Sequence, residues 1–367
     1  MANKRLKKKR RKADGLCQLC GDPLPANPGN YLVGTTGRGV CTLCLSVAQE
    51  ILAFRKEGLD VDKMKTKITP QTILRELEKS IVGQERAKRA VSVALWKQSL
   101  RANGMDIPNS SLLLYGPTGC GKTALLREAS KIADLPFMAV DATSLSETGY
   151  RGKDARDMIA DLVERYGPLR AKYAVVFLDE IDKLAATKGN EYRASYNRGT
   201  QHSLLKLIEG TEVQIDGGTF STENILFIYG GAFTAMRDSR KPKEQRRSIG
   251  FERSEPEEPE LPEQEFLPED FVQYGMEAEL MGRIGRCVPL QALTADDLRE
   301  IMTKSNLSVY RSYQRLFDLF GRKIEMKEAE IDALIEKTLK RGMGARGLNA
   351  LVEEWVEPIL MQLAERV

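Results

Sequence analysis

Histidine, cysteine and long apolar segments are scarce in this 367-residue chain, and each scarcity excludes a class of protein. The only histidine is His202, so a Ser–His or Cys–His catalytic centre would have to use that residue. Six cysteines are too few for a disulfide scaffold of this length. No apolar run approaches the roughly 18 residues of a membrane-spanning helix, and the basic N-terminus continues into cysteine and glycine rather than an apolar signal segment. We therefore expect a cytoplasmic chain in a reducing compartment, with no membrane partner and no protease activity of its own.

The net charge of +4 is concentrated at the N-terminus. Residues 1–14 hold eight Lys or Arg residues and one Asp, which gives +7, so the other 353 residues carry −3. The body therefore lacks the basic surface typical of nucleic-acid-binding proteins, whereas the arm is a self-repelling, disordered polycation. Such an arm either improves solubility or makes a weak, salt-sensitive contact with nucleic acid or another polyanion. The sequence leaves both interpretations open.

Composition and pattern divide the chain into five segments, and its 42% apolar and 29% charged residues are typical of globular proteins. They are the basic arm 1–14, a cysteine-bearing domain 15–55, a polar linker 56–66, an α/β domain 67–289 and a mostly helical domain 290–367. In the α/β domain, apolar runs alternate with helical periods, which predicts a parallel sheet. The expected strands are 112–115, 137–140, 175–178 and 225–229; an acidic, proline-rich loop is expected at 252–270, and helices at 296–320, 328–340 and 345–366.

One glycine-rich segment has a phosphate-binding pattern. It fits G-x-x-x-x-G-K-[ST] and lies between the expected strand 112–115 and a helical stretch at 124–133. Glycines let backbone N–H groups close around phosphates, and the helix N-terminus adds partial positive charge. Lys122 would reach the β- and γ-phosphates, and the Thr123 hydroxyl would bind Mg²⁺. We therefore predict an ATP-binding loop that comprises Gly116, Pro117, Thr118, Gly119, Cys120, Gly121, Lys122 and Thr123.

Two adjacent carboxylates end the apolar run 175–178. Unpaired charges at a buried strand end are unfavourable, so Asp179 and Glu180 need a partner there, and Mg²⁺ provides one. Downstream of a phosphate loop this is the Walker B pattern, in which Asp179 would organise Mg²⁺ and Glu180 would polarise the attacking water. The pattern predicts ATP hydrolysis in addition to ATP binding.

Two CxxC units form C-x₂-C-x₂₀-C-x₂-C, with the ligand candidates Cys17, Cys20, Cys41 and Cys44. Each unit supplies two thiolates from one tight turn, and tetrahedral Zn²⁺ takes four. The pattern offers no fifth ligand or open position, so we predict a structural zinc site. Cys120 and Cys287 lie outside it, and we interpret both as ordinary core thiols.

Further motifs follow one another in order along the chain. They include Val82-Gly83-Gln84-Glu85, Gly149-Tyr150-Arg151-Gly152, LDEIDK at 178–183, LLKLIEGT at 204–211, Ile249-Gly250-Phe251, Met281-Gly282-Arg283 and Gly344-Ala345-Arg346-Gly347-Leu348. With the phosphate loop and the cysteine units, this series closely resembles the ClpX unfoldases of the AAA+ class, from about Cys17 to Glu353. The resemblance implies an AAA+ ATPase domain followed by a small helical domain, six copies in a ring, and unfolding of polypeptide substrates in an axial pore.

The resemblance also implies roles for particular residues near the nucleotide. Val82 and Gly83 match the pair that contacts adenine. Arg283 matches the arginine finger, which acts on the nucleotide of the neighbouring subunit. Arg346 matches sensor 2, an arginine of the small domain that reads the γ-phosphate.

Two loops resemble the family's polypeptide-contacting elements. Tyr150, which Arg151 follows, matches the pore-loop aromatic that grips polypeptide. Ile249, Gly250 and Phe251 match the tripeptide that docks on the ClpP peptidase. The resemblance therefore implies a ClpP-type partner, and the zinc domain and basic arm are the expected contacts for an adaptor or polyanion.

Three departures indicate a divergent, ClpX-like protein. Arg151 stands where the family has an aliphatic residue. The short loop between Thr211 and Ile225 lacks the family's Arg-Lys-His element, and no polar sensor-1 residue follows Gly231 unless Thr234 serves.

Other functions compatible with the ATPase motifs are a stand-alone remodeller without a peptidase, a nucleic-acid remodelling ATPase, or an inactive scaffold. The basic arm and cysteine units favour nucleic acid. Helicases, however, need basic and stacking residues along a channel, and the sequence shows no such set. Intact Lys122, Glu180 and Arg283 disfavour the scaffold.

Overall fold

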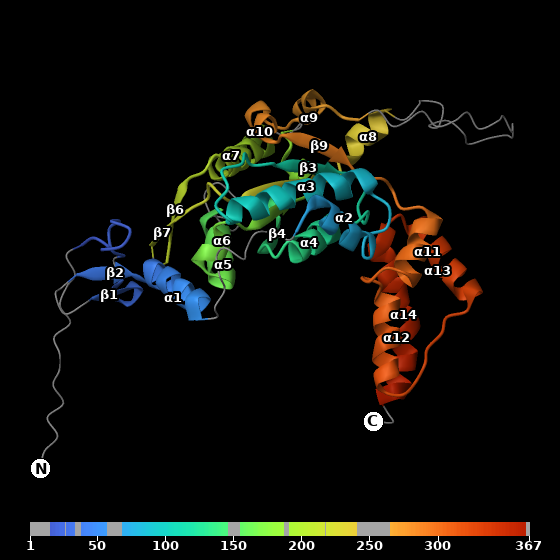
Figure 1. Cartoon of the computed structure of the whole chain (residues 1–367). Coiled ribbons are helices and arrows are strands. Elements are labelled where there is room, and N and C mark those ends of the chain that lie inside the picture. The colour runs from blue at the N-terminus through green and yellow to red at the C-terminus, as the bar shows by residue number, and fades with distance from the viewer. Residues whose placement is uncertain are drawn as a thin grey trace, which may run out of the picture.

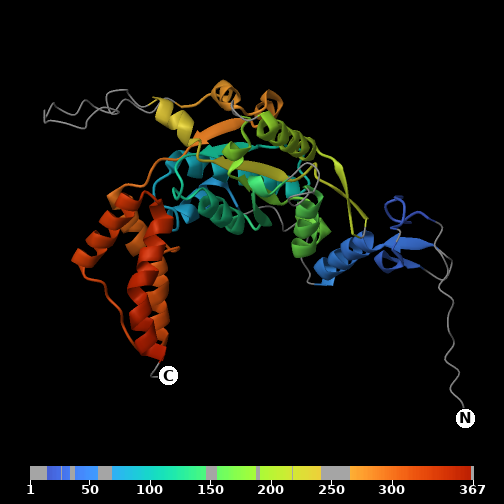
Figure 2. The same ribbon diagram turned by 180° about the vertical axis from the view of Figure 1, so that it is seen from behind.

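The computed structural model shows an arch, in which an N-terminal unit and a set of C-terminal helices lie at opposite ends of a central α/β body (Figures 1 and 2). The structure describes residues 15–25, 27–33, 38–56, 68–145, 155–186, 191–216, 218–240 and 265–364.

A five-stranded parallel sheet forms the centre of the body. Its order is β4 (Phe137–Asp141), β5 (Val175–Asp179), β8 (Leu226–Gly231), β3 (Leu112–Tyr115) and β9 (Arg286–Pro289). The four expected strands are confirmed, with small shifts at their ends. The sequence did not predict β9, an edge strand in which only Val288 is fully buried.

Helices cover both faces of the sheet. Successive side chains of a strand point to opposite faces, so each apolar strand contributes to a core on either side. Leu112 and Leu114 of β3 belong to one apolar core, whereas Leu113 and Tyr115 belong to the other. Strands β3, β5 and β8 are buried on both faces and read as continuous apolar runs, which is why the sequence predicted them. Strand β4 lies at an edge and buries only Met138, but its sequence is also an apolar run. The first core includes α2 (Pro70–Glu78), α3 (Glu85–Ala102) and α4 (Lys122–Ile132); the second includes α5 (Ala155–Tyr166), α6 (Pro168–Ala171), α7 (Glu191–Ile208), α8 (Thr234–Arg240), α9 (Pro268–Tyr274) and α10 (Ala278–Arg283).

The C-terminal helices pack around a core of their own. They are α11 (Ala295–Thr303), α12 (Val309–Leu319), α13 (Glu328–Arg341) and α14 (Gly344–Ala364). The expectation of one helix over 296–320 is wrong, because Ser308 caps the start of α12 by accepting a hydrogen bond from the Arg311 N–H. No described helix, α14 included, combines the length and apolar character that a bilayer crossing needs.

The turn between α11 and α12 connects these helices to the body. The Ser305 hydroxyl donates to the Ser80 carbonyl at 2.5 Å, and the Asn306 N–H donates to the Lys79 carbonyl at 2.9 Å. Both acceptors follow directly after α2, so the end of one body helix holds the turn.

The acidic segment expected to remain a loop to residue 270 ends earlier. Helix α9 begins at Pro268, which suits the first position of a helix because its missing N–H needs no partner there. The Asp270 carboxylate accepts a hydrogen bond from the Leu267 N–H at 2.8 Å and so supports the start of the helix.

The N-terminal unit contains a short antiparallel pair and one helix: β1 (Tyr31–Val33), β2 (Gly39–Cys41) and α1 (Thr42–Lys56). Helix α1 lies against α6 and against a hairpin of the body, β6 (Glu212–Ile215) and β7 (Gly218–Ser221). Figures 1 and 2 show this hairpin reaching from the body to the unit. The contact is close, because a Cβ on Gly218 would lie 3.1 Å from the Leu43 Cβ and 3.3 Å from the Cys41 sulfur.

Short 3-10 helices complete the described elements: Pro28–Asn30, Ala142–Ser144 and Ile181–Leu184.

Candidate functional site

The phosphate-loop pattern has the predicted strand–loop–helix surroundings. Strand β3 ends at Tyr115, the loop follows, and α4 begins at Lys122 directly after Gly121, whose φ is +101°. The loop also lies against the C-terminal helices, since a Cβ on Gly119 would come within 2.1 Å of the Met343 carbonyl oxygen. Residue 119 must therefore be glycine for two reasons: a side chain would clash with the Met343 carbonyl, and its φ of +78° lies in the left-handed region that favours glycine.

Lys122 and Thr123 face different partners at the start of α4. The Lys122 ammonium is nearly buried and donates to the carbonyls of Gly116 at 2.7 Å and Pro117 at 3.0 Å. The Thr123 hydroxyl donates to the Asp179 carboxylate at 3.1 Å. A hydroxyl and a carboxylate from two elements thus meet beside the phosphate loop, and hard oxygens of this kind suit Mg²⁺.

Glu180 has an unusual backbone conformation. Its φ of +61° lies in the left-handed region, which a residue with a side chain adopts only at a cost of about 1–3 kcal/mol. Its N–H donates to the Asp179 carboxylate at 2.9 Å, and its own half-exposed carboxylate pairs with Lys183. The hydrogen bond that the Lys183 ammonium donates to the Glu180 carboxylate raises the pKa of Lys183 above its usual value. Strain at this position is typical of residues whose orientation matters for function.

Asp182 is a site residue that the sequence analysis missed. Its two carboxylate oxygens accept hydrogen bonds from the N–H groups of Ala232 and Phe233, each at 3.2 Å. These residues follow β8, where the family resemblance predicts a polar sensor-1 side chain and Thr234, the first residue of α8, is the candidate. The contact connects the ends of β5 and β8, and its only sequence signal was the second Asp of LDEIDK.

The expected adenine pair lies where the body meets the C-terminal helices. Val82 lines a cavity of about 290 Å³ together with residues of α11 and the following turn. A Cβ on Gly83 would lie 3.6 Å from the Asp297 carboxylate of α11. Gln84 closes the junction by exchanging two 2.9 Å hydrogen bonds with the backbone of Gln291.

Arg346 lies in the first turn of α14, next to the phosphate loop. The N–H of the preceding residue, Ala345, donates to the Gly119 carbonyl at 3.1 Å. A cation at a helix N-terminus opposes the positive end of the helix dipole. The helix itself therefore gives no electrostatic reason for an arginine there, whereas a phosphate held by the adjacent loop does.

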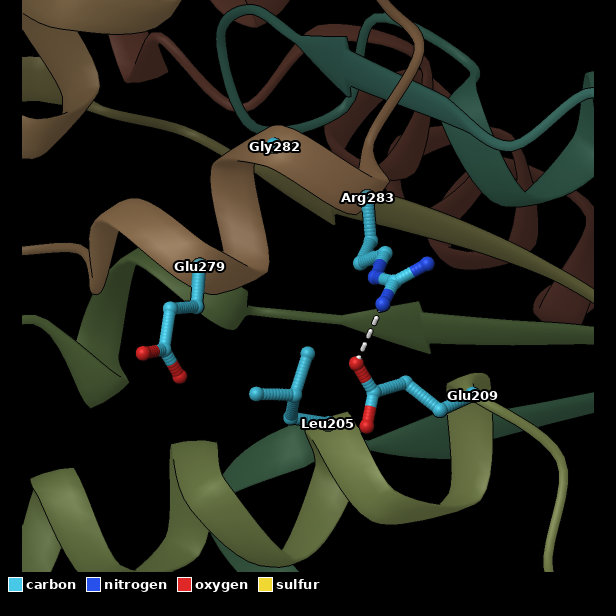
Figure 3. Close-up of a pocket in the computed structure, with 5 residues that line it drawn as sticks. All are labelled: Leu205, Glu209, Glu279, Gly282 and Arg283. Atoms are coloured by element: carbon cyan, nitrogen blue, oxygen red, sulfur yellow. Dashed lines mark hydrogen bonds and ion pairs between the residues drawn. The ribbon is translucent and has the colours of Figure 1, made fainter.

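Arg283 is the last residue of α10, and its side chain is 59% exposed. Its Nη2 donates to the Glu209 carboxylate at 2.6 Å. Figure 3 shows the pair across a pocket of about 540 Å³, which Leu205, Glu209, Glu279, Gly282 and Arg283 line. The described interactions of Arg283 do not include the phosphate loop of its own chain.

The four predicted metal ligands converge. The sulfurs of Cys17, Cys20, Cys41 and Cys44 all lie within 4.8 Å of one another. Tetrahedral Zn–S bonds of about 2.3 Å place sulfurs about 3.8 Å apart, so this arrangement needs only slight closure around an ion.

The protonation of the cluster also fits a cation. Burial alone would raise the pKa of Cys17, but hydrogen bonds from the backbone of Cys20, Cys41 and Leu19 lower it to about 6. Burial raises the pKa of Cys20 to about 11, and burial with neighbouring thiols raises that of Cys44 further. These shifts favour the thiolate at Cys17 and the thiol at Cys20 and Cys44, and a divalent cation would supply the charge that deprotonates these two thiols. The residues fit a zinc ion.

The two remaining cysteines match the expectation of core thiols. Cys120 is buried and Cys287 is partly buried, and burial raises the pKa of both, that of Cys287 to about 11.

Comparison with known proteins agrees with this geometry. Residues 107–287 match the family described as AAA domain (Cdc48 subfamily), and residues 293–365 match the C-terminal, D2-small domain of ClpB protein. The ATP-dependent Clp protease ATP-binding subunit ClpX of Treponema denticola is 32% identical over 365 residues, covering 92% of this chain and 88% of that protein. This chain belongs to the ClpX family.

Two further ClpX relatives match over nearly the same length. ClpX 2 of Wolinella succinogenes is 30% identical over 372 residues, covering 95% of this chain and 91% of its own. ClpX of Azotobacter vinelandii is 30% identical over 381 residues, covering 95% of this chain and 86% of that protein. The resemblance and the predicted AAA+ fold class are confirmed, and the identities near 30% fit a divergent member.

One departure from the ClpX pattern has a structural basis. The segment between Thr211 and Ile225, which lacks the Arg-Lys-His element, is not a plain loop but the hairpin β6–β7 that contacts α1. The other loop predictions lie outside the described residues: Tyr150, Arg151 and the Ile249-Gly250-Phe251 tripeptide, together with the basic arm 1–14.

Proposed function

We propose that this ClpX-family chain is an ATPase that assembles into a hexameric ring and uses hydrolysis to unfold polypeptide and thread it through an axial pore. The observation that carries the proposal is the meeting of Thr123, Asp179 and Glu180 beside the phosphate loop, in a chain that belongs to the ClpX family.

Each nucleotide-site residue has a role in this proposal. Lys122 and the loop N–H groups bind the β- and γ-phosphates of ATP, while Val82 and Gly83 contact the adenine. Thr123 and Asp179 hold Mg²⁺, and Glu180 accepts a proton from the attacking water. Arg346 reads the γ-phosphate within the same chain, and Arg283 reaches the γ-phosphate that the neighbouring copy binds.

The cysteine cluster holds structural zinc in this proposal. So small a unit buries too little apolar surface to fold by itself, so metal binding supplies much of its folding free energy.

Removing the metal is expected to unfold the N-terminal unit and leave the body folded. Chelation of reduced protein should make residues 15–56 sensitive to protease, while the main thermal transition of the body persists. Elemental analysis should find about one zinc per chain, the number that a single four-thiolate site holds.

Two cysteine variants make the zinc measurement specific. Cys20→Ser removes an exposed ligand and should lose the metal, whereas Cys287→Ser, outside the cluster, should retain it. Reduced, folded wild-type protein without bound metal would contradict the zinc assignment.

The proposal extends to partners through residues outside the described part of the chain. Tyr150, with Arg151 beside it, grips polypeptide in the pore, and Ile249-Gly250-Phe251 docks on a ClpP-type peptidase. Two apolar side chains between basic and acidic, proline-rich flanks suit an anchor for a hydrophobic pocket. Six such loops on one ring would bind by avidity, and the zinc unit or basic arm would contact an adaptor or polyanion.

The second candidate function is a stand-alone remodeller of protein or protein–nucleic acid complexes. The altered hairpin β6–β7 and Arg151, which depart from the ClpX pattern, favour it. It predicts the same ATPase chemistry without a peptidase.

One degradation assay separates these functions. Unfolded protein should raise the ATPase rate at least about twofold, DNA should not, and with a ClpP-type peptidase of the same host the unfolded protein should be degraded. Phe251→Ala should abolish degradation but keep the stimulated ATPase, since a central apolar anchor contributes about 2 kcal/mol or more.

The outcomes of this assay are distinct. Stimulation by DNA alone would make the chain a nucleic-acid remodeller. Stimulation by protein without any peptidase binding by wild type would make it a stand-alone unfoldase.

A further inference from the structure

The pair Arg283–Glu209 lies outside the nucleotide loop of its own chain and is open to solvent. The side chains of Arg283 and Glu209 are 59% and 41% exposed. Figure 3 shows Arg283 extending from the end of α10 toward Glu209, at the end of α7, while the Glu279 carboxylate points elsewhere. An exposed arginine has many rotamers, so a finger that must reach one phosphate needs something to hold it.

We propose that Glu209 is the positioning residue of Arg283: it holds the guanidinium in the orientation that reaches the nucleotide of a neighbouring copy. This inference rests on the function proposed above, because it assumes that Arg283 acts in trans. Glu209 engages only Nη2 among the described contacts, so the N–H groups of Nη1 and Nε remain available to other acceptors, such as a phosphate oxygen.

The carboxylate of Glu209 lies at an electrostatically unfavourable place, just past the end of α7. It follows Ile208, the last residue of α7, where the negative end of the helix dipole disfavours a carboxylate. Nothing in α7 therefore explains an acid there, whereas the facing guanidinium does. Residues that break a local rule are expected at functional sites.

Both partners are mounted on rigid backbone. Leu204 and Leu207 of α7 are buried in the core of the body, as are Leu280 and Met281 of α10. A pair whose ends are both anchored in one core holds its geometry far better than a pair on loops.

Gly282, the neighbour of Arg283, provides an independent observation. A Cβ there would meet nothing within 4 Å, and its φ is not in the left-handed region, so the chain itself has no need of glycine. Glycine inside α10 is unfavourable compared with alanine. Its absent side chain leaves the surface beside Arg283 bare for the close approach of another molecule, and the second copy that carries the nucleotide fits that requirement.

A matched pair of variants tests the inference in the full-length protein. Glu209→Gln should lower kcat for ATP hydrolysis by about tenfold or more, because a misplacement near 1 Å costs up to about 10²-fold. The KM for ATP and the melting temperature should stay unchanged, since an exposed ion pair adds little stability. Glu279→Gln removes the same charge from the same pocket without touching Arg283, and should keep kcat within twofold.

A double variant shows whether Glu209 acts through Arg283. Adding Glu209→Gln to Arg283→Ala should cause no further loss, because the interaction is already gone. Glu209→Asp should recover part of the rate by restoring the charge. Ring assembly, followed by light scattering, should be the same for Glu209→Gln and wild type.

Each contrary result is diagnostic. Wild-type or higher kcat in Glu209→Gln, with kcat lost in Arg283→Ala, would overturn the positioning role and leave the finger intact. An additional loss in the double variant, or failure to assemble, would also overturn it. Wild-type kcat in Arg283→Ala would instead overturn the trans role of Arg283, and with it this inference.

Discussion

Mixing Arg283→Ala subunits with Lys122→Ala subunits is expected to restore ATP hydrolysis that neither variant shows alone. An Arg283→Ala subunit still binds ATP through Lys122 but lacks the finger. A Lys122→Ala subunit binds ATP poorly but still presents Arg283. At an interface where the second faces the nucleotide of the first, every required group is present, and steady-state ATPase assays of the mixture should detect the recovery.

The expected effect is large because the finger acts on charge that develops in the transition state. Arginine fingers contribute roughly 10³–10⁵ in rate, about 4–7 kcal/mol, so Arg283→Ala alone should hydrolyse almost no ATP. Lys122→Ala alone should also be nearly inactive, because it binds ATP poorly. Random mixing in equal amounts makes about one in four of all head-to-tail interfaces productive, because half of the nucleotide sites keep Lys122 and half of the facing subunits keep Arg283. Pre-assembled rings of each variant, combined without exchange, provide the control and should stay inactive. A monomer with full activity would contradict the ring.

Glu180→Gln is expected to stop hydrolysis while leaving ATP binding intact. General-base catalysis contributes about 10²–10⁴ in rate, and glutamine cannot accept the proton. The described contacts of the Glu180 carboxylate are with Lys183, and the phosphate loop keeps its own hydrogen bonds. Single-turnover hydrolysis and equilibrium binding of ATP, measured on the same sample, test both halves.

Lys122→Ala is the matched contrast, since it removes a phosphate contact and should weaken binding itself. Because Glu180→Gln holds ATP, it should also retain client proteins, and a pull-down with this variant is the direct way to identify them. Hydrolysis at the wild-type rate in Glu180→Gln would show that another group is the base.

The parts of the site predicted from sequence are those in which one short segment contains the whole signal. The phosphate loop needs its glycines, lysine and threonine in a fixed order, so spacing alone located Lys122 and Thr123. The strands buried on both faces read as apolar runs. The paired CxxC units likewise located a cluster that the structure brings within 4.8 Å.

The parts not predicted depend on contacts between distant segments. Strand β9 spans only Arg286–Pro289, fully buries only Val288, and pairs with β3 from far along the chain. Asp182 and Glu209 look like ordinary acids until β8 and α10 lie beside them. The roles assigned to Tyr150 and to Ile249-Gly250-Phe251 remain predictions.

The hairpin β6–β7 connects the cysteine cluster to the region of Glu209 through one continuous stretch of backbone. At its tip, Gly218 lies against Cys41 of the metal cluster, and at its base only two residues, Gly210 and Thr211, separate Glu209 from the start of β6. Free energies of coupling between two sites are reciprocal. If zinc binding changes the affinity with which Arg283, in its proposed role, engages a neighbour's nucleotide, that engagement must change the affinity for zinc by the same factor. Metal affinity would then vary around a ring whose subunits hold different nucleotides.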